Sequence, residues 1–338
     1  MLNVLVASPL APEMVERIAA VDPRVQLTYR GDLLGHPRYA GDHFPPIQRT
    51  EAQAGEWARL LGEAEVMLDV DQPSAPDIVR LAPRLRWIQS SSSGVGDWIR
   101  RLKLVETPIV VTNTAGMHAR PLAEYAVFAM LYFARSWPRM AAEQRAHHWE
   151  RCAIDTLEHK TLGIIGLGRV GGMVAQLARP FGMRVIGIRR TVAEVHVDVD
   201  AVFGPDQLHA VLRQCDYVVL SVPSTPQTVG MLGARELACL RPSAVLINIA
   251  RGSLVDEAAL VDALRTGQLG GAALDVVSRE PLPAGSPLWD MPNVLVTPHS
   301  MSTAVTENEW LTDLFCDNLR RYLRGEPLRN QVDKIRGY

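Results

Sequence analysis

Short runs of apolar, often β-branched residues alternate along the chain with longer segments of helical periodicity. In the first third, this pattern predicts strands at 2–7, 66–68, 87–89 and 109–112, and helices at 12–20 and 73–81. Strands that alternate with helices indicate parallel βαβ units, because a parallel return needs a crossover connection. The polar, proline-containing stretch 29–53 breaks this rhythm, and we expect it to be a long surface excursion.

A second series of the same kind begins near residue 161. It predicts strands at 162–165, 185–188, 217–221, 244–249, 272–276 and 294–296, and helices at 170–181, 206–214 and 257–265. The segment 117–149 is strongly helical after Pro121, and a last helix over 303–323 has Gly325 as its C-cap signal. We therefore expect an α/β protein with two doubly wound parallel-sheet domains.

Charge and composition exclude several classes of function. Lys and Arg total 35 and Asp and Glu 37, so the net charge of −2 favours neither nucleic acid nor an anionic membrane as a partner. The longest apolar stretch, 122–134, contains Glu124 and is shorter than the roughly 18 to 20 residues that cross a bilayer. The residues 1–10 lack the basic start of a secretory signal and are predicted to be a strand.

The four cysteines are Cys152, Cys215, Cys239 and Cys316. They are scattered, with no paired spacing and no clustered histidines, so the sequence predicts neither a disulfide framework nor a metal site. We expect free thiols in a reducing cytoplasm.

A glycine-rich loop joins the strand 162–165 to the following helix. Its residues are Gly166, Leu167, Gly168, Arg169, Val170 and Gly171. The first two glycines permit a tight turn and close approach of a pyrophosphate to the helix N-terminus, and Gly171 lets the helix pack on the strand. This context predicts a dinucleotide-binding (Rossmann-like) site.

The end of the next strand bears on the choice of cofactor. A ribose with free hydroxyls is usually held by an acidic residue about 20 residues on, but Arg189, Arg190 and Thr191 stand there, Arg189 being 18 residues past Gly171. Guanidinium groups and a hydroxyl bind a 2′-phosphate through charge-assisted hydrogen bonds. We therefore expect NADP(H) to be preferred over NAD(H). The alternative, two solvated arginines on a loop, stays open.

Three later segments place reactive side chains where predicted strands end, which is where open α/β sheets bind ligands. They are Asn248-Ile249-Ala250-Arg251-Gly252, the segment 275–281 with Asp275 and Glu280, and Thr297-Pro298-His299. Together with the glycine loop, they resemble the D-2-hydroxyacid dehydrogenase family, and within it the NADPH-preferring glyoxylate/hydroxypyruvate reductase branch. The resemblance extends to 87–95 and 116–125 but is weaker over 29–53 and after 323.

The resemblance implies roles for individual residues. Arg251 would bind the 2-oxo acid and polarise its carbonyl, His299 would be the general acid or base, and Glu280 would hold the other ring nitrogen of His299. The amides of Ser93, Gly94 and Val95 would meet the substrate carboxylate. The cofactor would be contacted by the glycine loop, by Arg189, Arg190 and Thr191, and by Val222, Pro223, Thr228, Ile249 and Asp275.

The same resemblance implies the domain organisation and the activity. Residues 1–115 with 300–338 would form the substrate domain and 116–299 the dinucleotide domain, with the active-site cleft between them. We expect reduction of a small 2-oxo acid, such as glyoxylate or hydroxypyruvate, to the D-2-hydroxy acid. The alternative is a dinucleotide-dependent, corepressor-like binding protein of the same fold. The aromatic helical region 118–149 is expected to form a homodimer interface.

Overall fold

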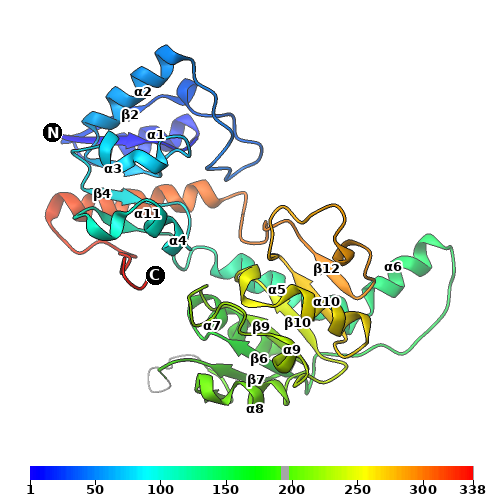
Figure 1. The fold of residues 1–338 in the computed structure, drawn as a ribbon. Helices are drawn as coiled ribbons and strands as arrows, with labels where there is room; N and C mark the ends of the chain where they lie inside the picture. Colours follow the sequence, from blue (N-terminus) through cyan, green and yellow to red (C-terminus); the bar gives the residue numbers. More distant parts are fainter. Residues whose placement is uncertain (192–197, 338) are drawn as a thin grey trace. The chain divides into compact units, whose positions relative to one another are not determined.

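The computed structural model of this chain describes residues 1–191 and 198–337, and it divides into two compact units (Figure 1). Unit 1 comprises Met1–Met117 and the chain from Thr303 onward, and unit 2 comprises His118–Ser302. Each unit is built on one parallel sheet with helices on both faces. The expected α/β class with two doubly wound sheets is confirmed.

Unit 1 contains a five-stranded parallel sheet with the order β2-β1-β3-β4-β5. The strands are β1 (Leu2–Val6), β2 (Val25–Tyr29), β3 (Val66–Leu68), β4 (Trp87–Gln89) and β5 (Val110–Thr112). The helices are α1 (Pro12–Ala19), α2 (Glu51–Glu63), α3 (Ile78–Leu81), α4 (Gly96–Arg101) and α11 (Glu307–Arg324). The apolar runs did not predict β2, an edge strand in which polar Gln26 and Thr28 separate the apolar residues.

The two faces of this sheet follow from the alternation of side chains along a strand. In β1, Val4 and Val6 belong to the core formed with α1 and α11, whereas Leu5 belongs to the core formed with α2, α3 and α4. Helix α11 ends at Gly325, whose φ of 68° is left-handed, so the predicted C-cap is confirmed.

The excursion between β2 and α2 is not a simple surface loop, which corrects the prediction for 29–53. Leu33, Leu34 and His43 are buried. Arg49 lies over the Trp57 ring at 4.3 Å and donates a hydrogen bond of 2.8 Å to the buried Asp71. Tertiary contacts of polar side chains with the domain core therefore hold this segment, and such contacts leave no periodic signal in the sequence.

Unit 2 contains a seven-stranded parallel sheet with the order β12-β11-β10-β9-β6-β7-β8. The strands are β6 (Thr161–Ile165), β7 (Arg184–Ile188), β8 (Ala201–Phe203), β9 (Tyr217–Leu220), β10 (Val245–Asn248), β11 (Gly271–Leu274) and β12 (Val294–Val296). Strand β8 lies at the edge and was not predicted. Successive strands are added on one side of β6 as far as β8, and then on its other side from β9 to β12. The point between β6 and β9 is therefore a topological switch point, and the carboxyl ends of strands at such a point form the usual ligand site of this architecture.

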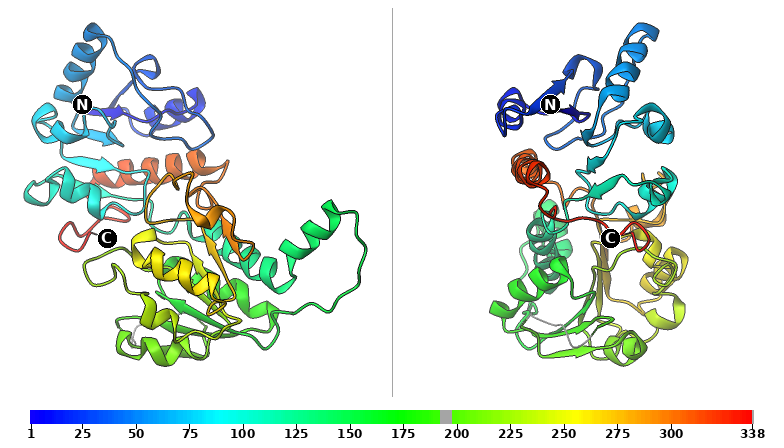
Figure 2. Two further views of the ribbon diagram at one scale, coloured as in Figure 1. Left: turned by 45° about the vertical axis from the view of Figure 1, so that its right-hand side comes forward. Right: turned by 90° about the vertical axis from the view of Figure 1, so that its left-hand side faces the viewer.

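Five helices of 4 to 16 residues cover this sheet. They are α5 (Ala119–Ala134), α7 (Arg169–Ala178), α8 (Leu208–Leu212), α9 (Ala234–Leu237) and α10 (Glu257–Arg265). Helices α5 and α7 pack on one face, and α8, α9 and α10 on the other. A further helix, α6 (Trp137–Arg145), follows α5 after a break at Ser136, buries no side chain and projects from the unit (Figure 2).

Among the described residues, none of the helices combines the length and the apolar character that a membrane span requires.

Candidate active site

The predicted glycine loop lies directly after β6, at the switch point of the unit 2 sheet. Gly166 has a φ of +107°, which strongly favours glycine. A Cβ atom on Gly171 would lie 2.0 Å from the carbonyl oxygen of Gly166, so a side chain there would push the helix off the loop. A Cβ on Gly168 would meet no atom within 4 Å. The loop thus presents an open surface at the start of α7, where Arg169 and Val170 follow.

Arg189, Arg190 and Thr191 lie immediately after β7, the strand that pairs with β6. The amide of Arg189 donates to the carbonyl of Phe203 on β8 at 3.0 Å, which fixes the backbone at this end of the strand. Arg190 and Thr191 are exposed. The sheet therefore places Arg189 and Arg190 at the end of the strand next to the glycine loop. Residues 192–197 lie outside the described part of the chain.

The segment after β9 carries Val222, Pro223 and Thr228. The Thr228 hydroxyl donates to the carbonyl of Pro223 at 2.7 Å and accepts from the amide of Thr225 at 2.8 Å. Thr228 thus closes the turn that carries Val222 and Pro223. Because β9 pairs with β6, this turn lies beside the glycine loop, and the Val222 side chain is 2.8 Å from the position a Cβ of Gly166 would take.

Arg251 follows β10 in a loop whose shape Asn248 holds. The Asn248 side chain donates to the carbonyl of Arg251 at 2.9 Å and accepts from the amide of Ala250 at 3.1 Å. A Cβ on Gly252 would lie 2.0 Å from the backbone of Val277, so the loops after β10 and β11 touch at this glycine. Ile249 is buried beside them. This contact brings the Arg251 loop to the segment that carries Glu280.

His299 and Glu280 form the pair that the family resemblance implies. The Nδ1 atom of His299 lies 2.8 Å from Oε2 of Glu280, and both side chains remain about two-fifths exposed, at 41% and 39%. Burial alone would raise the pKa of Glu280, but the hydrogen bond and charge of His299 outweigh it and lower the pKa, and Arg251 contributes in the same direction. Glu280 is therefore an ionised partner for the imidazole at neutral pH.

Asp275 holds the loop that carries His299. Its Oδ1 atom accepts from the Thr297 hydroxyl at 2.8 Å and from the amide of Ser300 at 3.1 Å, and its carbonyl accepts from the amide of His299 at 2.9 Å. His299 has a φ of 52°, a left-handed conformation that costs energy for a residue with a side chain. Burial raises the pKa of Asp275, and these hydrogen bonds offset the shift only in part.

Sequence reasoning assigned no supporting role to Tyr125 and Thr297, which both hold this loop. The hydroxyl of Tyr125, on α5, lies 3.3 Å from the Thr297 oxygen that donates to Asp275. Burial raises the pKa of Tyr125 to about 12, so its hydroxyl keeps its proton. Both residues stand in segments with recognisable motifs, but their contact joins positions 172 residues apart and leaves no local pattern.

In unit 1, the predicted substrate loop Ser93, Gly94 and Val95 follows β4. The buried Asp69 accepts from the amide of Ser91 at 2.7 Å, and the Asn113 side chain donates to the carbonyl of Ser93 at 2.9 Å. Within the described part of the chain, the amides of residues 93–95 have no hydrogen-bond acceptor. They therefore form a short run of backbone hydrogen-bond donors to which an anion can bind.

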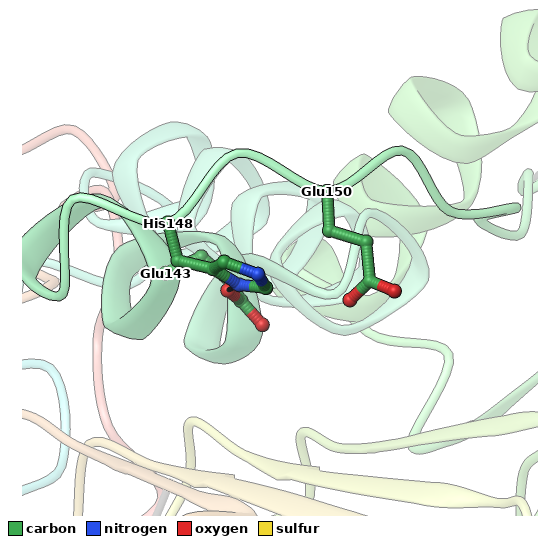
Figure 3. Close-up of side chains that lie close together, drawn as sticks. All are labelled: Glu143, His148 and Glu150. Carbon is green, nitrogen blue, oxygen red and sulfur yellow. Dashed lines mark hydrogen bonds and ion pairs between the residues drawn. The ribbon is translucent and has the colours of Figure 1, made fainter.

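One group of histidine and carboxylate side chains with metal-ligand spacing occurs among the described residues. The ligand atoms of Glu143, His148 and Glu150 lie within 4.8 Å of one another (Figure 3). Arg139 already contacts this group, at 3.1 Å from a Glu150 oxygen and 3.6 Å from a Glu143 oxygen. A guanidinium balances the carboxylate charges, so we assign no metal to this exposed cluster.

Comparisons with known proteins place this arrangement in a family. Residues 127–300 match the family model described as D-isomer specific 2-hydroxyacid dehydrogenase, NAD binding domain. The chain is 36% identical to a glyoxylate reductase of Thermococcus gammatolerans over 75% of this chain and 78% of the relative. It is 34% identical to a D-3-phosphoglycerate dehydrogenase of Methanocaldococcus jannaschii over 76% of this chain, but the match spans only 49% of that protein.

A solved structure extends the likeness to both units. The D-isomer specific 2-hydroxyacid dehydrogenase from Xanthobacter autotrophicus, determined in complex with NADPH and MES, is 30% identical, and the match covers 99% of each chain with a TM-score of 0.78. The residues matched by the family model, 127–300, include the glycine loop, Arg251, Glu280 and His299. The chain belongs to the D-isomer specific 2-hydroxyacid dehydrogenase family.

Proposed function

We propose that this protein reduces a 2-oxo acid to the D-2-hydroxy acid with a nicotinamide dinucleotide, reversibly and with a preference for NADPH. The observation that carries the proposal is the 2.8 Å pair of His299 and ionised Glu280, on a loop next to the Arg251 loop and in the same sheet as the glycine turn. These groups supply an acid–base residue, a cationic binder and a dinucleotide cradle.

The chain offers a surface that fits the cofactor. Gly166, Gly168 and Gly171 would hold the pyrophosphate at the start of α7, where Gly168 leaves the approach open. Arg189, Arg190 and Thr191 would hold a 2′-phosphate at the end of β7. When bound, the nicotinamide supplies the hydride that reduces the carbonyl carbon. NADPH in the Xanthobacter relative supports this choice, and NAD(H) is the second cofactor that we propose for this site.

The chain's own residues would manage the substrate and its proton. The planar guanidinium of Arg251 would bridge the carboxylate and carbonyl oxygens and draw charge onto the carbonyl oxygen. The Nε2 atom of His299 would give its proton to that oxygen as the carbon accepts the hydride, and would take the proton back in the oxidative direction. The free amides of Ser93, Gly94 and Val95 would donate hydrogen bonds to the substrate carboxylate.

Glyoxylate and hydroxypyruvate are the small acids that we propose the enzyme can reduce. The glyoxylate reductase activity named for the Thermococcus relative supports this class. The competing possibility is a binding protein that keeps the fold and uses the dinucleotide as a signal. Such a binding protein needs a groove for a partner peptide, which the sequence does not reveal, and turnover of a simple 2-oxo acid separates the two possibilities.

The test is the loss of absorbance at 340 nm when purified protein meets NADPH or NADH with glyoxylate, hydroxypyruvate, pyruvate, phenylpyruvate or 2-ketopantoate. Turnover of any of these acids with NADPH supports the reductase. Tight NADPH binding with no turnover in the panel would overturn it in favour of the binding protein.

We also propose a homodimer formed through the region 118–149. Phe128 and Trp137 on this surface are 51% and 53% exposed, and Trp149 is 95% exposed. Phe128 lies on α5, Trp137 on α6 and Trp149 in the segment after α6. Groups of exposed aromatic side chains are typical of subunit interfaces. Light scattering should give twice the chain mass of 37.2 kDa at micromolar concentration. A reducing cytoplasmic location belongs to the same proposal, and the free, buried thiols of Cys215 and Cys316 fit it.

A further inference from the structure

A cavity of about 350 Å³ lies within unit 1 at the carboxyl ends of β3 and β4. Its lining includes Val70 after β3, Gly94 after β4, Trp98 and Arg101 on α4, and Phe44 from the excursion between β2 and α2, with Gln72 also on the wall. The roles assigned above use only the Gly94 side of this space. The greater part of the cavity has no assigned ligand.

The cavity is continuous with the loop of free backbone amides. Ser92, Gly94 and Val95 line it, and the amides of Ser93, Gly94 and Val95 are the donors proposed to hold the substrate carboxylate. An acid held there has the rest of its carbon skeleton within reach of the cavity. The substituent on the 2-oxo carbon is therefore the part of the ligand that this space can accept.

We propose that this cavity is a substituent pocket and that the preferred substrates are 2-oxo acids with a large apolar group of the aryl class. This inference rests on the proposed function, because it assumes that the amides after β4 hold the carboxylate. It adds that glyoxylate and hydroxypyruvate leave most of the pocket unfilled.

The size and the walls of the pocket carry the inference. Phe44, Val70, Val95 and Trp98 form the larger apolar side chains of the lining, with Ala75 and Pro76, and the polar part of the wall is Asp69, Gln72, Ser90, Ser92 and Arg101. An apolar cavity of about 150 Å³ is enough to bind benzene, so a volume of about 350 Å³ accepts a benzyl group with space to spare. Aromatic side chains on the wall favour an aryl ligand through offset or edge-on ring contacts.

Buried polar contacts fix the walls in place. Asp71, in the loop after β3, accepts from the Trp57 indole at 2.9 Å, from Arg49 at 2.8 Å and from Ser74 at 3.0 Å. Asp69, which also lines the pocket, holds the amide of Ser91 at 2.7 Å. The loops after β3 and β4 are thus anchored before a ligand arrives, and a pre-formed pocket avoids the cost of ordering its walls on binding.

The rival ligand for this pocket is a 2-oxo dicarboxylate. Arg101 is the cationic side chain in the lining, and it is exposed at the wall. An exposed ion pair contributes little in water, whereas a second carboxylate in the pocket would lose water against the apolar side chains of Phe44, Val70 and Trp98. The observations therefore favour an apolar substituent over a charged one.

The test compares kcat/KM for phenylpyruvate, glyoxylate and 2-oxoglutarate with NADPH in the wild type and in Gln72→Trp. Gln72 is exposed on the pocket wall, so an indole there occupies space without disturbing the core. The matched control is Gln26→Trp, on the exposed side of edge strand β2. We expect a phenylpyruvate-to-glyoxylate ratio of at least about ten in the wild type, a fall of at least tenfold in that ratio in Gln72→Trp, and an unchanged ratio in Gln26→Trp.

Three results would overturn the inference while the proposed function stands. The first is a wild-type preference for glyoxylate over phenylpyruvate. The second is a phenylpyruvate-to-glyoxylate ratio of kcat/KM that does not change in Gln72→Trp. The third is a preference for 2-oxoglutarate that is lost in Arg101→Gln and kept in Arg100→Gln. If no 2-oxo acid is turned over, the proposed function fails, and calorimetric titration of the NADP⁺-loaded protein with phenylpyruvate still decides the inference. Binding that Gln72→Trp weakens by tenfold supports the pocket, and absence of binding refutes it.

Discussion

His299 and Glu280 meet through Nδ1 and Oε2 at 2.8 Å, although 19 residues separate them. Glu280 follows β11 and His299 follows β12, and these strands are neighbours in the unit 2 sheet. The parallel register therefore brings both residues to the same edge. Because Nδ1 faces the carboxylate, Nε2 is the ring nitrogen left to exchange a proton with a substrate.

Replacement of His299 by Gln should lower kcat for reduction by roughly 10² to 10⁴, because the developing alkoxide loses its proton donor. NADPH affinity, measured by fluorescence titration, should stay within about twofold. His209→Gln is a matched control, since His209 also lies 2.8 Å from a carboxylate, that of Glu236, in the same unit. A His299→Gln enzyme that turns over as fast as His209→Gln would remove His299 from the mechanism.

The Glu280→Gln variant should change the pH dependence of the reaction. The pKa of Glu280 is lower in the folded protein than its ordinary value of 4.5. The ion pair with His299 therefore contributes fully to stability above pH 4.5, and this contribution is lost as the pH falls through the pKa of the folded state. Without the carboxylate, the protonated imidazole loses its counter-charge. As the pH is raised, we expect the reduction rate of the variant to begin to decline at a lower pH than that of the wild type. At neutral pH, its kcat should be about tenfold lower. Superimposable pH profiles would contradict this role.

Arg251→Lys should reduce kcat/KM for the 2-oxo acid by about 10²-fold, because an ammonium is a point charge and cannot bridge two oxygens in a plane. Arg279→Lys makes the same change on an exposed side chain of the neighbouring loop and should have little effect. Steady-state kinetics of the two variants at saturating NADPH provide the measurement. Equal kinetic constants for both would show that Arg251 does not bind the substrate.

The double variant Arg189→Ala/Arg190→Ala should lower the ratio of kcat/KM for NADPH to that for NADH by about ten- to a hundredfold. This range is what the loss of one charge-assisted hydrogen bond to a 2′-phosphate implies. Arg213→Ala removes an exposed arginine after α8 of the same unit and serves as the control. Equal efficiency of the two cofactors in the wild type would already refute the NADPH preference.

Asp275→Asn should change how stability depends on pH. The pKa of Asp275 is raised in the folded protein by burial, so the unfolded chain ionises first, and this group makes folding less favourable as the pH rises above 3.8. The amide oxygen of Asn can still accept from Thr297 and Ser300, but it carries no buried charge. The melting temperature of Asp275→Asn relative to wild type should therefore increase with pH, as followed by circular dichroism. A difference that is independent of pH would contradict the assignment.

Much of the fold could be predicted from the sequence because the signals are local. The strands at 66–68, 87–89 and 294–296 and the helix at 257–265 have the predicted bounds. Strands β2 and β8 were missed, whereas β5 and β12, which also lie at sheet edges, were predicted. In β2 the polar residues Gln26 and Thr28 interrupt the apolar run. The excursion 29–53 was expected at the surface, but Arg49 and His43 are anchored by contacts with distant residues.

By itself, the sequence determined the parallel α/β architecture, the glycine loop and the presence of Arg251, Glu280 and His299 at strand ends. These features depend on periodicity and on motifs of a few residues, which a linear chain displays directly. Only the tertiary structure decided that Asp275 holds His299 in a left-handed conformation, that Tyr125 supports Thr297, and that Phe44 and Trp98 line one cavity. These relationships join side chains far apart in the sequence, and their distances exist only once both sheets have formed.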